Sequence, residues 1–165
     1  MKGLIIYDME QQQCEYIAQK LAASTRVAYV NVENTPSLHE TEALILVKKG
    51  RYNNETSAAL LHLVANAEMP SVKMALVVHC CSTLTGRYHK FYYNGNNGSY
   101  INQFNPSNTV SNGSRLHQIL RMKGVGTIDD CVCFYSPFLL GHVTTDSMMR
   151  TIRFVRRALG LGRYE

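Results

Sequence analysis

The sequence contains none of the short motifs that mark common hydrolases and nucleotide-hydrolysing enzymes. It has no GxSxG segment for a nucleophilic serine, no HExxH for a catalytic zinc and no GxxxxGK[ST] phosphate loop. No apolar run comes near the ~20 residues that a membrane span needs. These absences argue against a hydrolase, a nucleoside triphosphatase and a membrane-spanning protein.

The composition is that of an ordinary globular chain. Of the 165 residues, 45% are hydrophobic and 18% are charged, which suits one domain spanning residues 1–165. A chain of this length buries roughly 70% of the surface that it exposes when unfolded. The apolar stretch in the opening segment MKGLIIYDMEQQQ is too short for a secretory signal, so we expect a cytoplasmic protein.

Acidic residues are missing from one stretch near the carboxyl terminus. Five arginines lie between residues 150 and 163 with no Asp or Glu among them, and they equal the whole net charge of +5. A basic helix of this kind can attract an acidic protein or a nucleic acid. We favour the solvated outer face of a terminal helix, with an acidic partner as the alternative, and we expect neither nucleic acid nor membrane.

Five near-continuous apolar runs are typical of strands that are buried on both faces of a parallel sheet. They cover residues 2–7, 26–32, 43–47, 73–80 and 132–135. Amphipathic segments between the runs predict helices. These cover 10–23, 54–67 and 114–123, and a last helix is capped by Thr144 or Thr145. The sequence therefore predicts an α/β fold with helices on both faces of a five-stranded parallel sheet.

Two of the connections between predicted strands depart from the regular alternation of strand and helix. Residues 33–42, between the second and third strands, have room for only one turn of helix. Residues 82–113 are rich in Tyr, Asn and Gly, which is too aromatic for a flexible linker and too rich in Gly and Asn for a helix. We interpret this segment as an ordered excursion after the fourth strand.

Three segments resemble the flavodoxin-like family, and together with the order of elements the resemblance covers nearly the whole chain. They are YDMEQQQCEYIA, ALILVKKGRYNNETSAALLHLV and KMALVVHCCSTLTG. The resemblance implies a three-layer sandwich with strand order 2-1-3-4-5. It also implies flavin mononucleotide (FMN) as cofactor, and a role as an electron carrier or oxidoreductase that meets a redox partner protein or a small substrate.

The resemblance places the cofactor in three loops at the carboxyl ends of the strands. The residues implied to bind FMN are Gln11, Gln12, Gln13, Cys14, Lys49, Gly50, Arg51, Tyr52, Asn53, Cys81, Ser82, Thr83 and Tyr88. Tyr52 or Tyr88 would stack on the flavin ring. No residue is identified as catalytic, and no metal site is predicted.

The first of these loops departs from the family pattern. A phosphate prefers helix amides, hydroxyl donors and a close glycine. This loop has no Gly, Ser or Thr between Asp8 and Gln13, and it carries Asp8 and Glu10. In a working site both acids would point away and the amides of residues 11–14 would bind, helped by Lys48, Lys49 or Arg51. In a vestigial site the acids would cap the first helix. The second hypothesis is thus a cofactor-free interaction module of the same fold.

The cysteines and histidines form no recognisable motif. The five cysteines are odd in number and include no CxxC pair, which argues against a disulfide scaffold or a zinc module. Cys80 and Cys81 end the fourth strand while Cys131 and Cys133 begin the fifth, so we expect the two pairs at opposite ends of the sheet. Three histidines near the crevice, at positions 79, 89 and 142, have no metal-ligand spacing.

Overall fold

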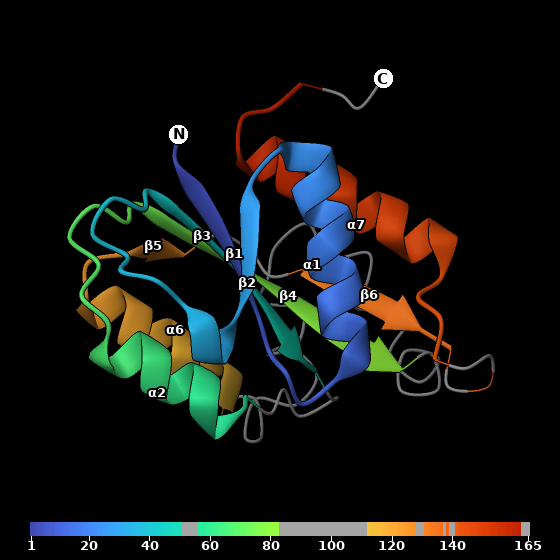
Figure 1. The fold of residues 1–165 in the computed structure, drawn as a ribbon, viewed down its shortest axis with the longest axis horizontal. Coiled ribbons are helices and arrows are strands. Elements are labelled where there is room, and N and C mark those ends of the chain that lie inside the picture. Colours follow the sequence, from blue (N-terminus) through green and yellow to red (C-terminus); the bar gives the residue numbers. More distant parts are fainter. Residues whose placement is uncertain (51–55, 83–111, 128–130, 137, 139–140, 163–165) are drawn as a thin grey trace.

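The computed structural model describes residues 1–50, 56–82, 112–127, 131–136, 138 and 141–162 (Figure 1). One sheet runs through these residues in the order β2-β1-β3-β4, with β5 and β6 both paired to the far edge of β4. Every strand pairing in it is parallel, which confirms the predicted sheet and its order. The strands are β1 (Gly3–Tyr7), β2 (Ala28–Asn31), β3 (Ala43–Lys49), β4 (Met74–Ser82), β5 (Gly126–Thr127) and β6 (Cys131–Tyr135).

The far edge of β4 pairs with two strands, whereas the sequence predicted one. β5 pairs with the start of β4, at Met74 and Ala75, whereas β6 pairs with its end, from Val78 to Ser82. The sequence prediction found β6 and missed β5, because a two-residue strand that begins with glycine has no apolar run to mark it.

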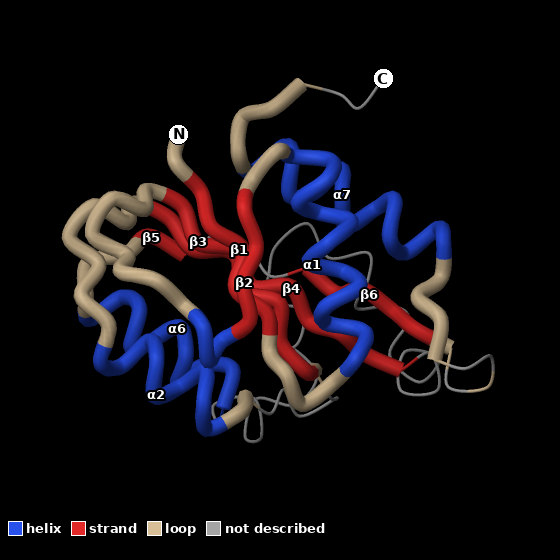
Figure 2. The backbone as a smooth tube through the Cα atoms, viewed as in Figure 1, coloured by secondary structure: helices blue, strands red, loops and turns tan. Residues whose placement is uncertain are grey.

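Helices cover both faces of the sheet (Figures 1 and 2). α1 and α7 pack beside each other on one face, and α2 and α6 on the other. A 3₁₀ turn, η1, stands between β2 and β3, where the sequence left room for one turn of helix. The bounds are α1 (Gln12–Thr25), η1 (Val32–Asn34), α2 (Ala58–Asn66), α6 (Asn112–Met122) and α7 (Thr145–Ala158).

Local backbone chemistry explains where predicted boundaries were wrong. Arg26 ends α1 in the left-handed region (φ 60°), with its N–H bonded to the carbonyl of Ala22, so β2 cannot begin at residue 26 as predicted. α2 begins later than predicted because Ser57 is its N-cap and accepts a hydrogen bond from the N–H of Leu60 at 3.2 Å. Thr144 is the N-cap residue of α7, as predicted, but its side chain makes no capping hydrogen bond.

Each face of the sheet has its own hydrophobic core because side chains alternate along the strands. Ile5, Ile45 and Val78 face α1 and α7. Leu4, Leu46 and Val77 face α2 and α6. None of the helices in the described ranges is both long and apolar enough to cross a membrane. Most of the excursion, residues 83–111, lies outside the described residues.

Candidate functional site

Three strands of the sheet, β1, β3 and β4, end side by side at its carboxyl edge. The sheet register pairs Tyr7 with Val47 and Lys48 with His79, so the chain leaves the sheet at neighbouring points. Of the thirteen residues that the family resemblance implies, eight are described and all lie at or beside these strand ends. The other five, Arg51, Tyr52, Asn53, Thr83 and Tyr88, lie outside the described residues.

The two carboxylates of the first loop are both engaged away from the start of α1. Asp8 is almost fully buried, and its Oδ1 accepts a hydrogen bond from the N–H of Glu10 at 3.2 Å. Glu10 forms an ion pair with Lys49, with its Oε2 3.3 Å from Nζ. Neither acid therefore caps α1, and the charge of Glu10 is already balanced.

The start of α1 has no side-chain cap. Gln11 is the N-cap residue and has the extended backbone of that position, but its side chain makes no capping hydrogen bond. Cys14 donates its N–H to the carbonyl of Gln11 at 3.1 Å and buries its thiol in the core. The positive end of the helix dipole thus has no acidic side chain bonded to it among the described residues.

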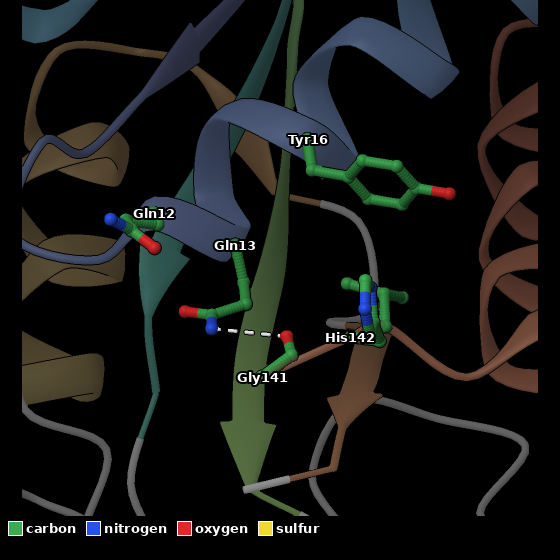
Figure 3. Close-up of a pocket in the computed structure, with 6 residues that line it drawn as sticks. Gln12, Gln13, Tyr16, Gly141 and His142 are labelled. Carbon is green, nitrogen blue, oxygen red and sulfur yellow. Dashed lines mark hydrogen bonds between the residues drawn. The ribbon is translucent and has the colours of Figure 1, made fainter. Parts of the chain in front are cut away.

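A small cavity flanks this helix start (Figure 3). Its volume is about 160 Å³, and α1 and the segment before α7 both line it, with Gln12, Gln13 and Tyr16 from α1 and Gly141, His142 and Val143 opposite. Nε2 of Gln13 donates a hydrogen bond to the carbonyl oxygen of Gly141 at 3.0 Å. A side chain at residue 141 would collide with Gln13, since a Cβ there would lie 2.2 Å from Nε2.

The second loop leaves the sheet through a tight contact at Gly50. Its N–H donates to the carbonyl of Cys80 at 2.9 Å. A Cβ on Gly50 would lie only 2.9 Å from both Sγ of Cys81 and Cβ of His79, so only glycine fits without displacing β4. The loop that follows β3 is therefore seated directly against the end of β4.

A row of buried ionisable side chains crosses the carboxyl edge on the face of α2 and α6. Lys48 pairs in register with His79, and Asp8 follows Tyr7 beside Lys48 because its N–H continues the ladder to the carbonyl of Val47 at 2.9 Å. All three side chains are almost fully buried, and Nζ of Lys48 lies 3.5 Å from Nδ1 of His79. We call Asp8, Lys48 and His79 the polar row.

Sequence reasoning missed the polar row. It considered Lys48 as a helper for the phosphate, whereas the structure places Lys48 within β3 with no exposed surface. The alternation Leu44, Leu46, Lys48 on one face of a buried strand was the available signal.

Burial changes the acidity of side chains at the end of the sheet. It raises the pKa of the Cys81 thiol to about 12, although the charge of Lys48 acts in the opposite direction. Burial also raises the pKa of Tyr135, against a hydrogen bond from Gln11 that lowers it. Ser82 ends β4 beside Tyr135, its partner on β6. Cys81 is thus a protonated, unreactive thiol at neutral pH.

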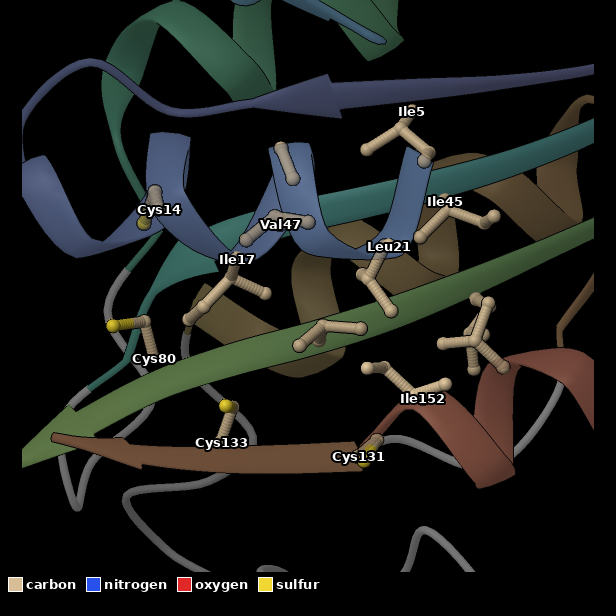
Figure 4. Close-up of a cluster of buried hydrophobic side chains, with 14 of the residues drawn as sticks. Ile5, Cys14, Ile17, Leu21, Ile45, Val47, Cys80, Cys131, Cys133 and Ile152 are labelled. Carbon is tan, nitrogen blue, oxygen red and sulfur yellow. The ribbon is translucent and has the colours of Figure 1, made fainter. Parts of the chain in front are cut away.

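The prediction that the cysteine pairs lie at opposite ends of the sheet is wrong. Because β6 pairs with the second half of β4, Cys80 stands directly opposite Cys133. Cys14 approaches both from α1 (Figure 4). The hydrogen bond with Cys14, together with burial, raises the pKa of Cys80 far above its usual range. We call Cys14, Cys80 and Cys133 the thiol cluster.

The described residues show no group of three His, Cys, Asp or Glu side chains that could hold a metal ion. The histidines do not converge there either. His79 belongs to the polar row on the α2 and α6 face, whereas His142 lines the cavity beside α1 on the other face. His89 lies outside the described residues.

Two of the α7 arginines already have partners within the chain. Arg150 forms an ion pair with Asp146 at 3.2 Å, one turn away. Arg156 donates hydrogen bonds to the carbonyls of Ser24 and Gly162 and so ties α7 to the end of α1. Arg153 and Arg157 are exposed on the outer face of α7.

Comparison with known proteins shows likeness in structure alone. No family model matches the sequence, and no curated protein matches it either. Oxidised flavodoxin 1 from Bacillus cereus superimposes with a TM-score of 0.63 at 12% identity, over 99% of this chain and 100% of that one. A flavodoxin from Fusobacterium nucleatum, solved with FMN bound, gives 0.51 at 18% identity over 78% of this chain and 70% of that one. The NAD(P)H:quinone oxidoreductase from Methanothermobacter marburgensis gives 0.52 at 9% identity, over 99% and 98%.

At such identities the likeness establishes architecture and not chemistry. Strand order, helix placement and near-complete coverage agree with one another. The chain has a flavodoxin-like fold.

Proposed function

We propose that this chain binds FMN at the carboxyl ends of β1, β3 and β4 and acts as an electron carrier or an FMN-dependent oxidoreductase. The observation that carries the proposal is the state of the α1 start. Its first turn has no side-chain cap, and the neighbouring acids Asp8 and Glu10 are bonded elsewhere. A phosphate at this position would meet helix amides, and the charge of Glu10 nearby is already balanced by Lys49.

The residues of the first loop fit FMN through amides instead of hydroxyls. The backbone of Gln12 and Gln13 forms the first turn of α1, and Lys49 lies within reach of the loop through Glu10. Two buried acceptors, Oδ2 of Asp8 and Oε1 of Gln11, have no hydrogen-bond partner among the described residues. An acceptor buried without a partner costs about 1–3 kcal/mol, so a ligand rich in hydroxyl donors, such as the ribityl chain of FMN, would relieve this cost.

When bound, FMN supplies the redox chemistry, since its ring system accepts and returns electrons. The chain's own residues hold and orient the cofactor. The helix start and Lys49 would hold the phosphate, and Gly50 fixes the second loop against β4, where the flavin ring is expected by resemblance.

A cofactor-free interaction module remains the second candidate, because one observation favours it. Gln13 already spans from α1 to Gly141, and it occupies the flank of the helix start with its own side chain. In a protein that no longer binds a phosphate at this helix start, a side chain such as that of Gln13 would fill the vacated space.

Titration of FMN with the purified full chain, followed by quenching of flavin fluorescence and by the visible absorbance bands, separates the two candidates. We expect saturable binding to the wild type. Lys49→Met should weaken it by about tenfold, the effect of losing one charge-assisted contact of roughly 1.5 kcal/mol. Lys73→Met removes the same charge from an exposed site beside the opposite end of β4, and should leave the affinity unchanged.

The replacement of Asp8 and Glu10 by threonine tests the loop directly. We expect the double variant to gain FMN affinity, chiefly because two hydroxyl donors appear beside the helix start, since Glu10 is already paired with Lys49. If the wild-type chain at any concentration neither quenches the fluorescence of FMN nor shifts its absorbance bands, FMN binding is refuted and the interaction module is the remaining candidate.

A further inference from the structure

The polar row is the least expected feature of the molecule. Three ionisable side chains lie in register across the three central strands of a sheet whose other interior positions are apolar. Removal of a charged group from water is costly unless the fold or a ligand compensates it. The row is therefore a place where ionisable groups are held inside the fold at the carboxyl edge.

The row lies where a ligand of the carboxyl edge would be held. Lys48 is the last-but-one residue of β3, and the loop that leaves β3 is pressed at Gly50 onto His79 and Cys81. Lys48 is also the register partner of His79, three residues before the end of β4 at Ser82. A group bound between these two strand ends would be close to an interior cation.

His79 fixes the position of that cation. Its Nδ1 lies 3.5 Å from Nζ of Lys48, and the burial of both side chains leaves little freedom for either. A neutral imidazole accepts a hydrogen bond from the ammonium at this atom. On the other side of Lys48, Oδ1 of Asp8 is bonded to the N–H of Glu10.

We propose that Lys48, positioned by His79, is an interior cation that makes the chain bind reduced, anionic FMN more tightly relative to the oxidised form. This inference rests on the proposed function. Reduction adds two electrons and one proton to FMN, so the cofactor gains one negative charge. A fixed positive charge would favour such a change by roughly tenfold if it lay about 10 Å from the flavin ring, at an effective dielectric constant of ~20.

The experiment measures the two-electron potential of FMN bound to the full chain, with dithionite as the electron donor and a reference dye. The potential gives the ratio of the affinities for the two oxidation states. Lys48→Met should lower this ratio about tenfold, which is a shift of ~30 mV for a two-electron couple. Lys73→Met removes a lysine charge near the other end of the sheet and should leave the potential at the wild-type value.

Two further variants keep the test decisive. His79→Asn retains the lysine but removes its positioning partner, and should lower the ratio by a smaller factor. If Lys48→Met fails to fold, because it leaves the buried Asp8 without a nearby positive charge, the double variant of Asp8→Asn with Lys48→Met is measured in its place. We expect its affinity ratio to be lower than that of Asp8→Asn alone.

The outcomes separate this inference from the proposed function. A wild type that binds no FMN would overturn both. If the wild type binds FMN and the affinity ratio of Lys48→Met stays within about twofold of the wild-type ratio, only the role of Lys48 is overturned. An equal fall in Lys73→Met would also overturn it, because the effect would then be one of net charge.

Discussion

The two faces of the sheet end differently at the same carboxyl edge. On the α1 and α7 face, Cys80 of β4 and Cys133 of β6 meet Cys14 of α1 in the thiol cluster. On the α2 and α6 face, His79, the residue before Cys80 on β4, belongs to the polar row. Lys48 and His79 are register partners, and so are Lys49 and Cys80, one position later. A shift of one residue thus separates a site of soft, neutral groups from a site of buried charge.

The thiol cluster contributes packing. Burial raises the pKa of Cys133 to about 11, so its thiol stays neutral at physiological pH and behaves as a small hydrophobic side chain. The polar row contributes no such packing benefit without compensation of its charges. The two faces thus differ in that one packs neutral side chains at the carboxyl edge and the other holds ionisable side chains there.

The largest effect is expected when a charged side chain is introduced into the thiol cluster, which tests whether the two faces differ in their tolerance of charge. Cys80→Asp buries a carboxylate among neutral thiols, and its register partner Lys49 is already paired with Glu10, so we expect the free energy of unfolding to fall by about 3–5 kcal/mol. Cys80→Ala is the control, with a loss of about 1 kcal/mol from the removed sulfur. Urea denaturation monitored by circular dichroism measures both. Equal losses would show that the thiol side tolerates charge as well as the polar row does.

The packing of the second loop onto the polar row gives the next largest effect. Gly50→Ala introduces a Cβ that would stand 2.9 Å from Sγ of Cys81 and from Cβ of His79, so β3 and β4 must separate. We expect a loss of about 1–3 kcal/mol in the free energy of unfolding.

Gly162→Ala is the matched control for that change. A Cβ at residue 162 would meet nothing within 4 Å, and its backbone is not in the left-handed region. The control should alter stability by less than about 0.5 kcal/mol. A Gly50→Ala variant as stable as the control would mean that the loop is not seated on β4.

The sequence predicted the sheet well because its strands are buried on both faces, and continuous apolar runs such as 43–47 mark them without ambiguity. The contact between Cys80 and Cys133 could not be predicted in this way. It depends on how β5 and β6 share one edge of β4, a register that no local pattern encodes.

The candidate site was less predictable than the fold for a related reason. The resemblance located the three loops, but whether an acid caps a helix or turns away is a matter of single hydrogen bonds. Glu10 with Lys49, and Asp8 with the N–H of Glu10, decide the charge of the first loop. The pair of Glu10 and Lys49 has no sequence signature, since the two residues are far apart in the chain, whereas the contact of Asp8 with the N–H two residues on is a local Asx-turn.

The smallest expected changes in stability concern the N-caps of α1 and α2, one helix on each face of the sheet. The side chain of Ser57 caps α2, whereas the side chain of Gln11, the N-cap residue of α1, makes no capping hydrogen bond. Ser57→Ala should cost about 1 kcal/mol in the free energy of unfolding, the usual value of an N-cap. Gln11→Asp should have the opposite sign. Residue 11 already has the extended backbone of a cap (φ −140°, ψ 122°), so a short carboxylate there can accept from the first-turn amides.

The same Gln11→Asp change sharpens the difference between a structural helix start and one kept open for a ligand. The new carboxylate should stabilise the chain without FMN by about 0.3–1 kcal/mol, through its position at the positive end of the helix dipole. It should also compete with a phosphate for those amides, so FMN affinity should fall by roughly tenfold or more. Ser57→Ala should leave FMN affinity unchanged, because α2 starts on the other face. Stability and affinity that rise together in Gln11→Asp would show that the phosphate does not bind at the start of α1.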